Sequence, residues 1–372
     1  DVERSRGLGD VYKRQLLILL YGIAVLFICA AFICVWAGAV KSAYQAQVCI
    51  EKNKPVTTFA EDIKSLFDKN LHKLLLTLPV GGILIFTILP LIFMIAMAFT
   101  NYSKVNSHLV LFDWVGLENF RQMFDVSGTF GKTFWSVLGW TIVWAVFATG
   151  LNYILGMLLA LLINRKGTKI KGFWRLIFIL SIAIPQFVSL LVMRSMLSQD
   201  GIINVMLKNA GWIQKSLPFF SNVAWARITV IVVNLWIGIP YTMMQVTGIL
   251  QNIPLELYEA AEVDGAGPVI RFFKITLPYM LFVTTPYLIT TFTANINNFN
   301  IVYLLTKGDP VLSGNTAGKT DLLVTWLYKM TVDYQYYNLG AVIGIMTFVF
   351  LAIGSLLVYR RTKSYKDEEG FQ

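Results

Sequence analysis

Charged residues are scarce in this chain. Asp, Glu, Lys and Arg make up 14% of its 372 residues, whereas a soluble protein carries about a quarter. Apolar and aromatic residues make up 56% of the chain, and the mean hydropathy is +0.63. This composition excludes an ordinary soluble enzyme or binding module and favours a protein that lies within a membrane.

Cysteine and histidine are rarer still, with three and two residues. Cys29 and Cys34 lie inside an apolar run and Cys49 follows it, so no disulfide framework is indicated. His72 and His108 fall in loops on opposite sides of the predicted membrane, so we expect no metal site. The sequence also lacks HExxH and CxxC motifs, a nucleophile–base constellation and acids in the middle of a span. We therefore expect no catalytic residue, and a membrane-bound enzyme or a proton-driven secondary transporter is disfavoured.

Long apolar runs are what the chain has instead. A helix needs about 20 apolar residues to cross the hydrocarbon of a bilayer, and in lipid the backbone must satisfy its own hydrogen bonds. The candidate spans are residues 16–40, 74–99, 133–163, 173–197, 226–251, 279–305 and 338–360. The predicted fold class is an all-α membrane protein.

Basic residues cluster beside two of these runs. The first cluster is Arg165, Lys166, Lys169, Lys171 and Arg175, and the second is Arg360, Arg361, Lys363 and Lys366. Because basic residues mark the cytoplasmic side, we expect both loop and C-terminus there, with residues 100–132, 198–225 and 306–337 outside. The net charge of +10 is thereby interpreted as an orientation signal and not as a nucleic-acid footprint.

The N-terminal part poses a parity problem. Seven spans with a cytoplasmic C-terminus put residue 1 outside, yet residues 1–15 are basic and begin without methionine. Our hypothesis is that residues 1–15 are partly an artefact and that a preceding helix is missing. Residues 16–40 are then an N-terminal transmembrane helix, 41–73 a cytoplasmic amphipathic linker, 74–360 a six-helix core, and 361–372 a cytoplasmic tail.

Two Gly-Lys-Thr triplets, at residues 131–133 and 318–320, invite comparison with a nucleotide-binding loop. Such a loop needs a further glycine five positions earlier and a preceding strand. Val126 and Ser313 occupy those positions, and both triplets fall in loops assigned to the outside. We therefore do not predict nucleotide binding on this chain.

A charged segment, residues 254–278, lies between two apolar runs on the predicted cytoplasmic side. Pro254 suits the first turn of a helix, and Gly265 is a common helix stop. One face of this helix would carry Leu257, Ala260, Ala261 and Asp264. A second helix is expected from about Pro268 to Ile275. The sequence predicts a rigid helix–turn–helix whose small alanines permit close approach of a partner.

The same segment fits a pattern of Glu-Ala-Ala, three residues, Gly, nine residues, Ile, one residue and Leu-Pro. The matching positions are Glu259, Ala260, Ala261, Gly265, Ile275, Leu277 and Pro278. This resembles the EAA motif of the inner-membrane permeases of binding-protein-dependent ABC importers. The resemblance covers about residues 41–372 and is closest to maltose/maltodextrin permeases of the MalF type. Further likenesses are "AFTNYS" (98–103), "DWVGLENF" (113–120), "YTMMQVTGIL" (241–250) and "DLLV" (321–324).

The resemblance implies a six-helix permease core with at least one N-terminal transmembrane helix, in the bacterial inner or plasma membrane. It implies that the EAA loop, with Glu259 and Asp264, docks into an ATPase subunit that holds ATP and magnesium. The chain itself would carry no cofactor and would not be an enzyme. The implied partners are a second homologous permease, an ATPase dimer, an extracytoplasmic sugar-binding protein and an oligosaccharide, and the implied mechanism is alternating access.

Amide side chains in two spans are candidates for binding a sugar. An amide costs free energy in hydrocarbon unless it is paired, and Asn295 and Asn298 would share a helix face. Asn234 lies near Gly238 and Tyr241, on a helix that we expect to be broken at Gly238 and Pro240. Trp236 or Tyr241 could stack on a sugar ring. The alternative is that these amides only hold neighbouring helices together.

Matching the sugar-contacting segments of the maltose permeases adds two residues to this set. The resemblance implies Asn234, Ile237, Gly238, Tyr241, Asn295, Asn298 and Gln186 as substrate-binding residues. The chain departs from the family pattern at Ile182, Gln186, Thr291 and Ala294, and aromatic surface is lost at Ile182 and Ala294. A longer glucan or another oligosaccharide is thus an alternative to maltose. Glycerol-phosphate is disfavoured because no candidate residue is basic.

Overall fold

The computed structural model describes the backbone of residues 2–361 apart from 54, 57, 106–107, 110–112 and 166. It describes side chains in that range apart from 2–16, 104–112 and 361. Within it, six helices are long and apolar enough to cross a membrane, and one bent pair would make a seventh. They correspond to the seven apolar runs, so the predicted all-α membrane class is confirmed. The chain divides into a terminal unit (1–120 and 335–342) and a core unit (121–334 and 343–372).

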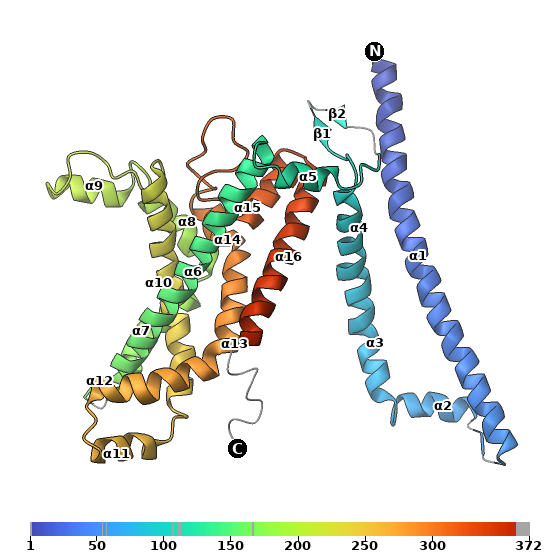
Figure 1. Ribbon diagram of the computed structural model, residues 1–372, viewed down its shortest axis with the longest axis horizontal. Coiled ribbons are helices and arrows are strands. Elements are labelled where there is room, and N and C mark those ends of the chain that lie inside the picture. Colours follow the sequence, from blue (N-terminus) through green and yellow to red (C-terminus); the bar gives the residue numbers. More distant parts are fainter. Residues whose placement is uncertain are drawn as a thin grey trace. The chain divides into compact units, whose positions relative to one another are not determined.

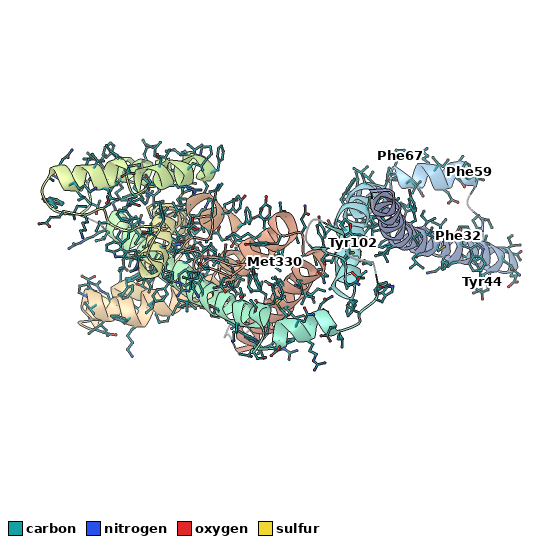
Figure 2. The ribbon with its side chains drawn as sticks, turned by 90° about the horizontal axis from the view of Figure 1, so that it is seen from above. Phe32, Tyr44, Phe59, Phe67, Tyr102 and Met330 are labelled. Carbon is teal, nitrogen blue, oxygen red and sulfur yellow. The ribbon has the colours of Figure 1, made fainter. Side chains whose placement is uncertain are left out.

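The terminal unit is built mainly of helices. They are α1 (Val2–Glu51), α2 (Phe59–Leu66), α3 (Leu71–Ile83) and α4 (Leu89–Ala98), with a π-helical turn at Leu84–Ile88. The short strands β1 (Lys104–Val105) and β2 (His108–Leu109) pair antiparallel. Phe32 and Tyr44 stand out from α1, and Phe59 and Phe67 from the α2 segment (Figure 2). Exposed apolar side chains along helices of this length suit contact with lipid.

The first helix is longer than its apolar run. α1 continues past the predicted end at residue 40 to Glu51, because "KSAYQAQVCIE" contains neither proline nor glycine. The amphipathic helix expected in residues 41–73 is therefore shorter, and α2 covers only part of that segment. A capping box starts α2: the Glu61 amide donates to Thr58 Oγ1 (3.4 Å), and the Thr58 amide donates to Glu61 Oε2 (2.7 Å).

One buried asparagine organises the end of α4. Asn119 donates from Nδ2 to the carbonyls of Ala98 (2.8 Å) and Thr100 (2.6 Å). Its Oδ1 accepts a hydrogen bond from Nδ2 of Asn338 (3.0 Å). The backbone N–H of Asn338 donates in turn to the Tyr102 carbonyl (3.1 Å). Segments far apart in sequence are thereby fixed to each other inside the terminal unit.

The core unit contains most of the remaining helices; α5 (Glu118–Phe124) and α16 (Tyr337–Arg361) are divided between the two units. The others are α6 (Thr129–Asn164), α7 (Lys171–Ala183), α8 (Gln186–Met196), α9 (Ile202–Asn209), α10 (Val223–Leu250), α11 (Leu255–Val263), α12 (Pro268–Arg271), α13 (Leu277–Ile296), α14 (Phe299–Leu305) and α15 (Leu323–Tyr328). In Figure 1, α11 and α12 lie at one end of this unit and α9 at the other.

α6 is the central helix and packs along α10 and α13. Small residues let the backbones approach: a side chain at Gly156 would overlap Thr242 on α10. The Asn164 amide at the end of α6 donates to Thr247 near the end of α10 (3.3 Å). Arg227, near the start of α10, lies over Trp140 of α6. The two helices therefore run parallel.

Three predicted spans differ in detail from the structure. The run 173–197 is bent by 86° between α7 and α8, because Pro185 cannot continue a helix. The run 279–305 is interrupted between α13 and α14 at Asn297 and Asn298. The break that we expected at Gly238 and Pro240 is wrong, since α10 continues through Pro240.

Candidate functional site

A cavity of about 450 Å³ lies among α6, α10, α13 and the corner between α7 and α8. Its lining includes all seven residues predicted to bind substrate: Gln186, Asn234, Ile237, Gly238, Tyr241, Asn295 and Asn298. Ile182, Thr291 and Ala294, where the chain departs from the family pattern, line it as well. The structure thus brings the predicted set together, while its role in binding sugar stays a prediction. The volume falls in the range of about 300–1,000 Å³ that is common for ligand sites.

The two interruptions of the helices bring polar groups to this cavity. Pro185 ends α7, so Gln186 becomes the first residue of α8 at the corner. After α13 ends, Asn298 caps α14 by accepting a hydrogen bond from the Ile301 amide (3.4 Å). Asn295 and Asn298 therefore do not share one helix face, but both still line the cavity.

Asn152 on α6 is a cavity residue that the sequence analysis missed. Its Nδ2 donates to the Ala148 carbonyl (2.7 Å), while its Oδ1 is buried without a partner. A Cβ at position 238 would overlap the Asn152 amide. Gly238 therefore leaves the space that this amide occupies. The only signal in the sequence is an asparagine inside a long apolar run, and that signal does not indicate which way the amide faces.

Asn234 presents the complementary group. Its side chain is 5% exposed, and its Nδ2 has no hydrogen-bond partner. Buried polar groups are nearly always paired, and leaving one unpaired costs about 1–3 kcal/mol. Two residues of the lining therefore carry buried, unpaired atoms, an acceptor on Asn152 and a donor on Asn234. Each atom has less than 1 Å² exposed, so a molecule with hydroxyl groups would pair with them once the amides turn toward it, because a hydroxyl donates and accepts.

Asn295 has a structural role in addition to its place in the lining. Its Nδ2 donates to Thr149 Oγ1 on α6 (3.0 Å), and its carbonyl accepts from Trp144 Nε1 (3.0 Å). These bonds join α13 to α6, as the alternative interpretation of the asparagines expected. Asn295 is thus partly a helix–helix contact, whereas Asn152 and Asn234 carry the unpaired atoms.

Aromatic and hydroxyl groups complete the lining. Tyr241 is 49% exposed and faces the cavity together with Tyr287, whereas Trp236 is not among the lining residues. Thr149, Thr242, Thr290 and Thr291 add hydroxyl groups. No Asp, Glu, Lys or Arg lines this cavity in the described part of the chain. Its chemistry therefore suits a neutral, hydroxyl-rich ligand.

The segment 254–278 forms the predicted helix–turn–helix. α11 ends in a Schellman motif: Gly265 has φ +77°, its amide donates to the Glu262 carbonyl, and the Ala266 amide donates to the Ala261 carbonyl (2.8 Å). Gly265 is therefore required by the backbone. The second helix is not a separate element, since α12 continues through a π-helical stretch, Phe272–Thr276, into α13.

Side-chain contacts fix this loop to the base of α13. Glu262 and Arg271 form an ion pair across the turn (2.9 Å), and Tyr258 Oη lies 2.9 Å from Thr276 Oγ1. Ile275 and Leu277, two positions of the EAA pattern, pack against a buried cluster that includes Met157 on α6 and Met280 on α13. These two residues therefore connect the loop to the core and do not form its outer surface.

The outer surface of the loop is partly apolar. Glu259, Ala260, Asp264 and Pro278 are exposed, and Ala261 is half-buried. Around them lie exposed Leu255, Leu257, Val263, Val269, Ile270 and Phe273, and Val263 is 88% exposed. Val269, Ile270 and Phe273 belong to the candidate span Pro268–Leu305. Exposed apolar side chains gathered on one segment indicate a contact with a protein or a membrane surface.

Comparisons with known proteins identify the family of the chain. Residues 152–364 match the family described as binding-protein-dependent transport system inner membrane component. The galactooligosaccharides transport system permease protein GanP of Bacillus subtilis (strain 168) is 36% identical over 354 residues, covering 94% of this chain and 84% of the relative. The maltodextrin transport system permease protein MalC of Streptococcus pneumoniae serotype 4 is 33% identical, covering 97% and 86%. The maltose/maltodextrin transport system permease protein MalF of Escherichia coli (strain K12) is 38% identical, covering 65% and 48%.

A solved structure shares the fold. The crystal structure of a bacterial alginate ABC transporter in complex with an alginate pentasaccharide-bound periplasmic protein contains a chain that aligns with a TM-score of 0.63. The alignment covers 83% of this chain and 98% of that chain, at 22% identity. At this identity the likeness speaks for the fold alone.

Proposed function

Because the chain belongs to the family of binding-protein-dependent transport system inner membrane components, we propose that it is the permease subunit of an ATP-driven importer for neutral oligosaccharides of the maltodextrin class. The observation that carries the substrate class is the uncharged cavity with an unpaired acceptor on Asn152 and an unpaired donor on Asn234. Sugar hydroxyls offer the matching donors and acceptors without a charge.

The maltodextrin assignment draws on the relatives. Two of them, MdxF of Bacillus subtilis and MalC of Streptococcus pneumoniae, are described as maltodextrin permeases and are 38% and 33% identical to this chain. The exposed ring of Tyr241 provides a stacking surface for a sugar ring in the cavity. The threonines beside it supply further hydroxyl contacts.

A galactooligosaccharide is the second candidate substrate. GanP, at 36% identity over most of both chains, is described as a galactooligosaccharide permease. Glycerol-phosphate fits less well, because a phosphate in a cavity of low dielectric needs a cationic partner and this cavity has none among its described lining.

Coupling to ATP would run through the loop at residues 254–278. Its exposed apolar patch surrounds Glu259, and both features suit insertion into a cleft on a separate ATPase subunit. The ATP and the magnesium ion would lie on that ATPase, so this chain would carry no cofactor and would not itself be an enzyme. Transport would follow alternating access, with the loop passing the closure of the ATPase dimer to α10 and α13.

The remaining partners are a second homologous permease and an extracytoplasmic sugar-binding protein. The chain would cross the bacterial cell membrane several times, with the loop 254–278 and the C-terminus in the cytoplasm. This orientation follows from the basic residues near 165–175 and after residue 359. The extracytoplasmic end of the core unit would then be the end that carries α9.

Uptake measurements test the proposal. Vesicles that contain the complete transporter and its binding protein should accumulate labelled maltotriose or longer glucans only when ATP is present on the ATPase side. Galactotetraose is the competing substrate and maltose the short control. ATP-coupled uptake of galactotetraose alone would replace the substrate assignment, and uptake that persists without ATP but stops on collapse of the proton gradient would overturn the importer.

A further inference from the structure

The two Gly-Lys-Thr triplets, which do not form nucleotide-binding loops, meet in the folded core unit. Lys132 and Thr133 on the first turn of α6 line the same small cavity as Gly318 and Lys319 in the loop before α15. The guanidinium of Arg227, on the first turns of α10, completes the lining on a third element. This cavity has a volume of about 150 Å³ and is separate from the proposed sugar cavity, with which it shares no lining residue.

The loop that carries the second triplet is rigidly held. Its Thr320 carbonyl accepts a hydrogen bond from Trp140 Nε1 on α6 (3.1 Å). A Cβ at Gly318 would overlap the carbonyl of Gly308, so the two glycines bring two stretches of the loop together. The side chain of Thr320 bonds to the Asp309 carbonyl (2.7 Å) and lies 2.9 Å from the Thr306 hydroxyl. The cavity wall is therefore fixed before any ligand arrives.

The single carboxylate in the lining is already neutralised. Asp321 accepts from Lys329 Nζ (2.6 Å) and from the Gly318 amide (2.7 Å) through Oδ2, and from Thr325 Oγ1 (2.9 Å) through Oδ1. Its side chain is fully buried. It therefore does not provide a counter-charge for the three cations that line the cavity.

Those three cations, Lys132, Lys319 and Arg227, have no acidic partner among the described residues, whose ion pairs are Arg271–Glu262 and Lys329–Asp321. Arg227 is nevertheless held in place. Its guanidinium carbon lies 4.3 Å from the centroid of the Trp140 ring, and its Nε donates to the Lys319 carbonyl (3.0 Å). A stacked arginine of this kind keeps its terminal nitrogens as a fork that matches a carboxylate.

The cavity lies at the end of the core unit opposite the loop 254–278. α6 and α10 run parallel, so their first turns are together here and their last turns meet at Asn164 and Thr247. The 24 residues from Arg227 to Leu250 at the end of α10 span about 35 Å. If that loop docks on the ATPase, as the proposed function states, then this cavity opens on the extracytoplasmic side, where the binding protein docks.

We propose that this cavity receives one acidic side chain of the extracytoplasmic binding protein, whose carboxylate is bound by Arg227 with Lys132 and Lys319 beside it. This inference rests on the proposed function for the identity of the partner. The volume fits a side-chain carboxylate and is too small for an oligosaccharide. Lys132 is exposed at the rim and Lys319 and Arg227 are half-buried, so the charges are graded from surface to interior, an arrangement that attracts an approaching acidic surface.

The test uses the complete transporter in nanodiscs and the sugar-loaded binding protein encoded with it. Arg227→Gln should weaken binding of that protein by at least about 10-fold, and the loss should shrink at high salt. Lys215→Gln is the matched control, since Lys215 is an exposed cation in the segment assigned to the same side and does not line the cavity. Its affinity should equal that of the wild type. ATP hydrolysis without the binding protein should be unchanged in both variants.

A second variant keeps the test decisive if Arg227→Gln does not assemble. Lys132→Gln combined with Lys319→Gln leaves Arg227 on Trp140 and should weaken binding about 5-fold or more. Wild-type affinity in this double variant, or in an assembled Arg227→Gln, would overturn the proposal. If, in addition to this wild-type affinity, acetate or phosphate stabilised the wild type but not the Lys132→Gln/Lys319→Gln variant, the cavity would be assigned to a free anion instead.

Charge reversal identifies the partner group. Arg227→Glu should abolish binding of the binding protein. Replacement by arginine of the Asp or Glu that enters the cavity should restore it. Failure of every such replacement would contradict the proposal. If the wild-type transporter bound no binding protein and took up no sugar, the proposed function would be wrong. If uptake were normal and the variants bound the binding protein as the wild type does, only the role of this cavity would be wrong.

Discussion

Replacing Gly238 by alanine separates a sugar-binding cavity from an incidental gap between helices. The new Cβ would overlap the side-chain amide of Asn152, which holds the unpaired acceptor of the cavity. Overpacking of a buried site costs about 1–3 kcal/mol, while alanine gains about 1 kcal/mol over glycine in a helix. The net loss of stability is thus at most about 2 kcal/mol, so the complex should still assemble.

The larger effect should fall on the sugar. Moving the Asn152 amide out of position removes one or two hydrogen bonds to the ligand, each contributing about 0.5–1.5 kcal/mol. A loss of about 1–2 kcal/mol corresponds to a 5- to 30-fold rise in the apparent KM for maltotriose. The assay is ATP-dependent uptake of labelled maltotriose in vesicles, with assembly checked by co-purification of the ATPase.

Two further variants decide how the result is interpreted. Gly248→Ala lies on the same helix with open space beside it, so it should transport as the wild type does. Gly238→Ala combined with Asn152→Ala removes the overlap and should recover stability while the KM stays raised. A wild-type KM in Gly238→Ala, or a KM restored in the double variant, would refute Asn152 as a sugar ligand.

Three other predictions concern the loop and the buried ion pair. Gly265→Ala places alanine at φ +77° and should cost about 1–2 kcal/mol in the loop, seen as weaker co-purification of the ATPase, whereas Gly267→Ala at φ −68° should not; equal retention of ATPase in both would contradict the role of the turn. Glu259→Lys should leave membrane insertion intact and abolish coupled uptake, with Glu256→Lys as control, and normal uptake would rule out docking through Glu259. Asp321→Asn leaves Lys329 buried without its partner and should lower stability by about 3–5 kcal/mol, measured by thermal unfolding in detergent. Asp321→Asn combined with Lys329→Met should recover most of that stability. No recovery would show that the unpaired Lys329 is not the cause of the loss.

Burial raises the pKa of the Asp321 carboxyl, and the charge of Lys329 beside it offsets part of that rise. The two effects have different causes: removal from water raises the pKa of Asp321, and the charge and hydrogen bond of Lys329, just after α15, lower it. The pair therefore acts as one unit, and removal of either member leaves the other without compensation. For this reason the double variant, Asp321→Asn with Lys329→Met, and not a single variant, measures the contribution of the ion pair to stability.

The sequence predicted what depends on local pattern. Uncharged runs of sufficient length located the spans, and Pro254 and Gly265 bounded α11, because helix caps act within one turn of the chain. The Schellman bonds at Gly265 are local in the same way. The bend of 86° at Pro185 was not predicted, although its proline is a local signal that could have indicated it.

What the sequence did not reveal depends on distant parts of the chain. Asn152 is one amide in a long apolar helix, and only its packing against Gly238 turns it toward the cavity. The sequence analysis placed Asn298 on a continuous helix. In the structure the helix is interrupted there, and the side-chain oxygen of Asn298 caps α14. The meeting of Trp140 with Thr320 joins residues 180 positions apart, which no local rule anticipates.

Two helices, α10 and α13, connect the cavity to the loop, and this has a mechanical consequence. α10 carries Asn234 and Gly238 in the lining and ends at the residues that lead into the loop, while α13 begins at the loop and carries Asn295. The Glu262–Arg271 ion pair and the Tyr258–Thr276 contact fix the loop to the base of α13. We therefore expect a displacement of the loop to move both helices at the cavity, because α10 and α13 each continue without interruption between the two sites. The interruption at Asn297 and Asn298 lies at the cavity, where Asn298 is part of the lining, so we expect it to absorb part of that movement before α14. Deleting the ion pair with Arg271→Gln should accordingly lower coupled uptake more than it lowers assembly, and an equal loss of both would show that the loop only holds the ATPase and does not drive α13.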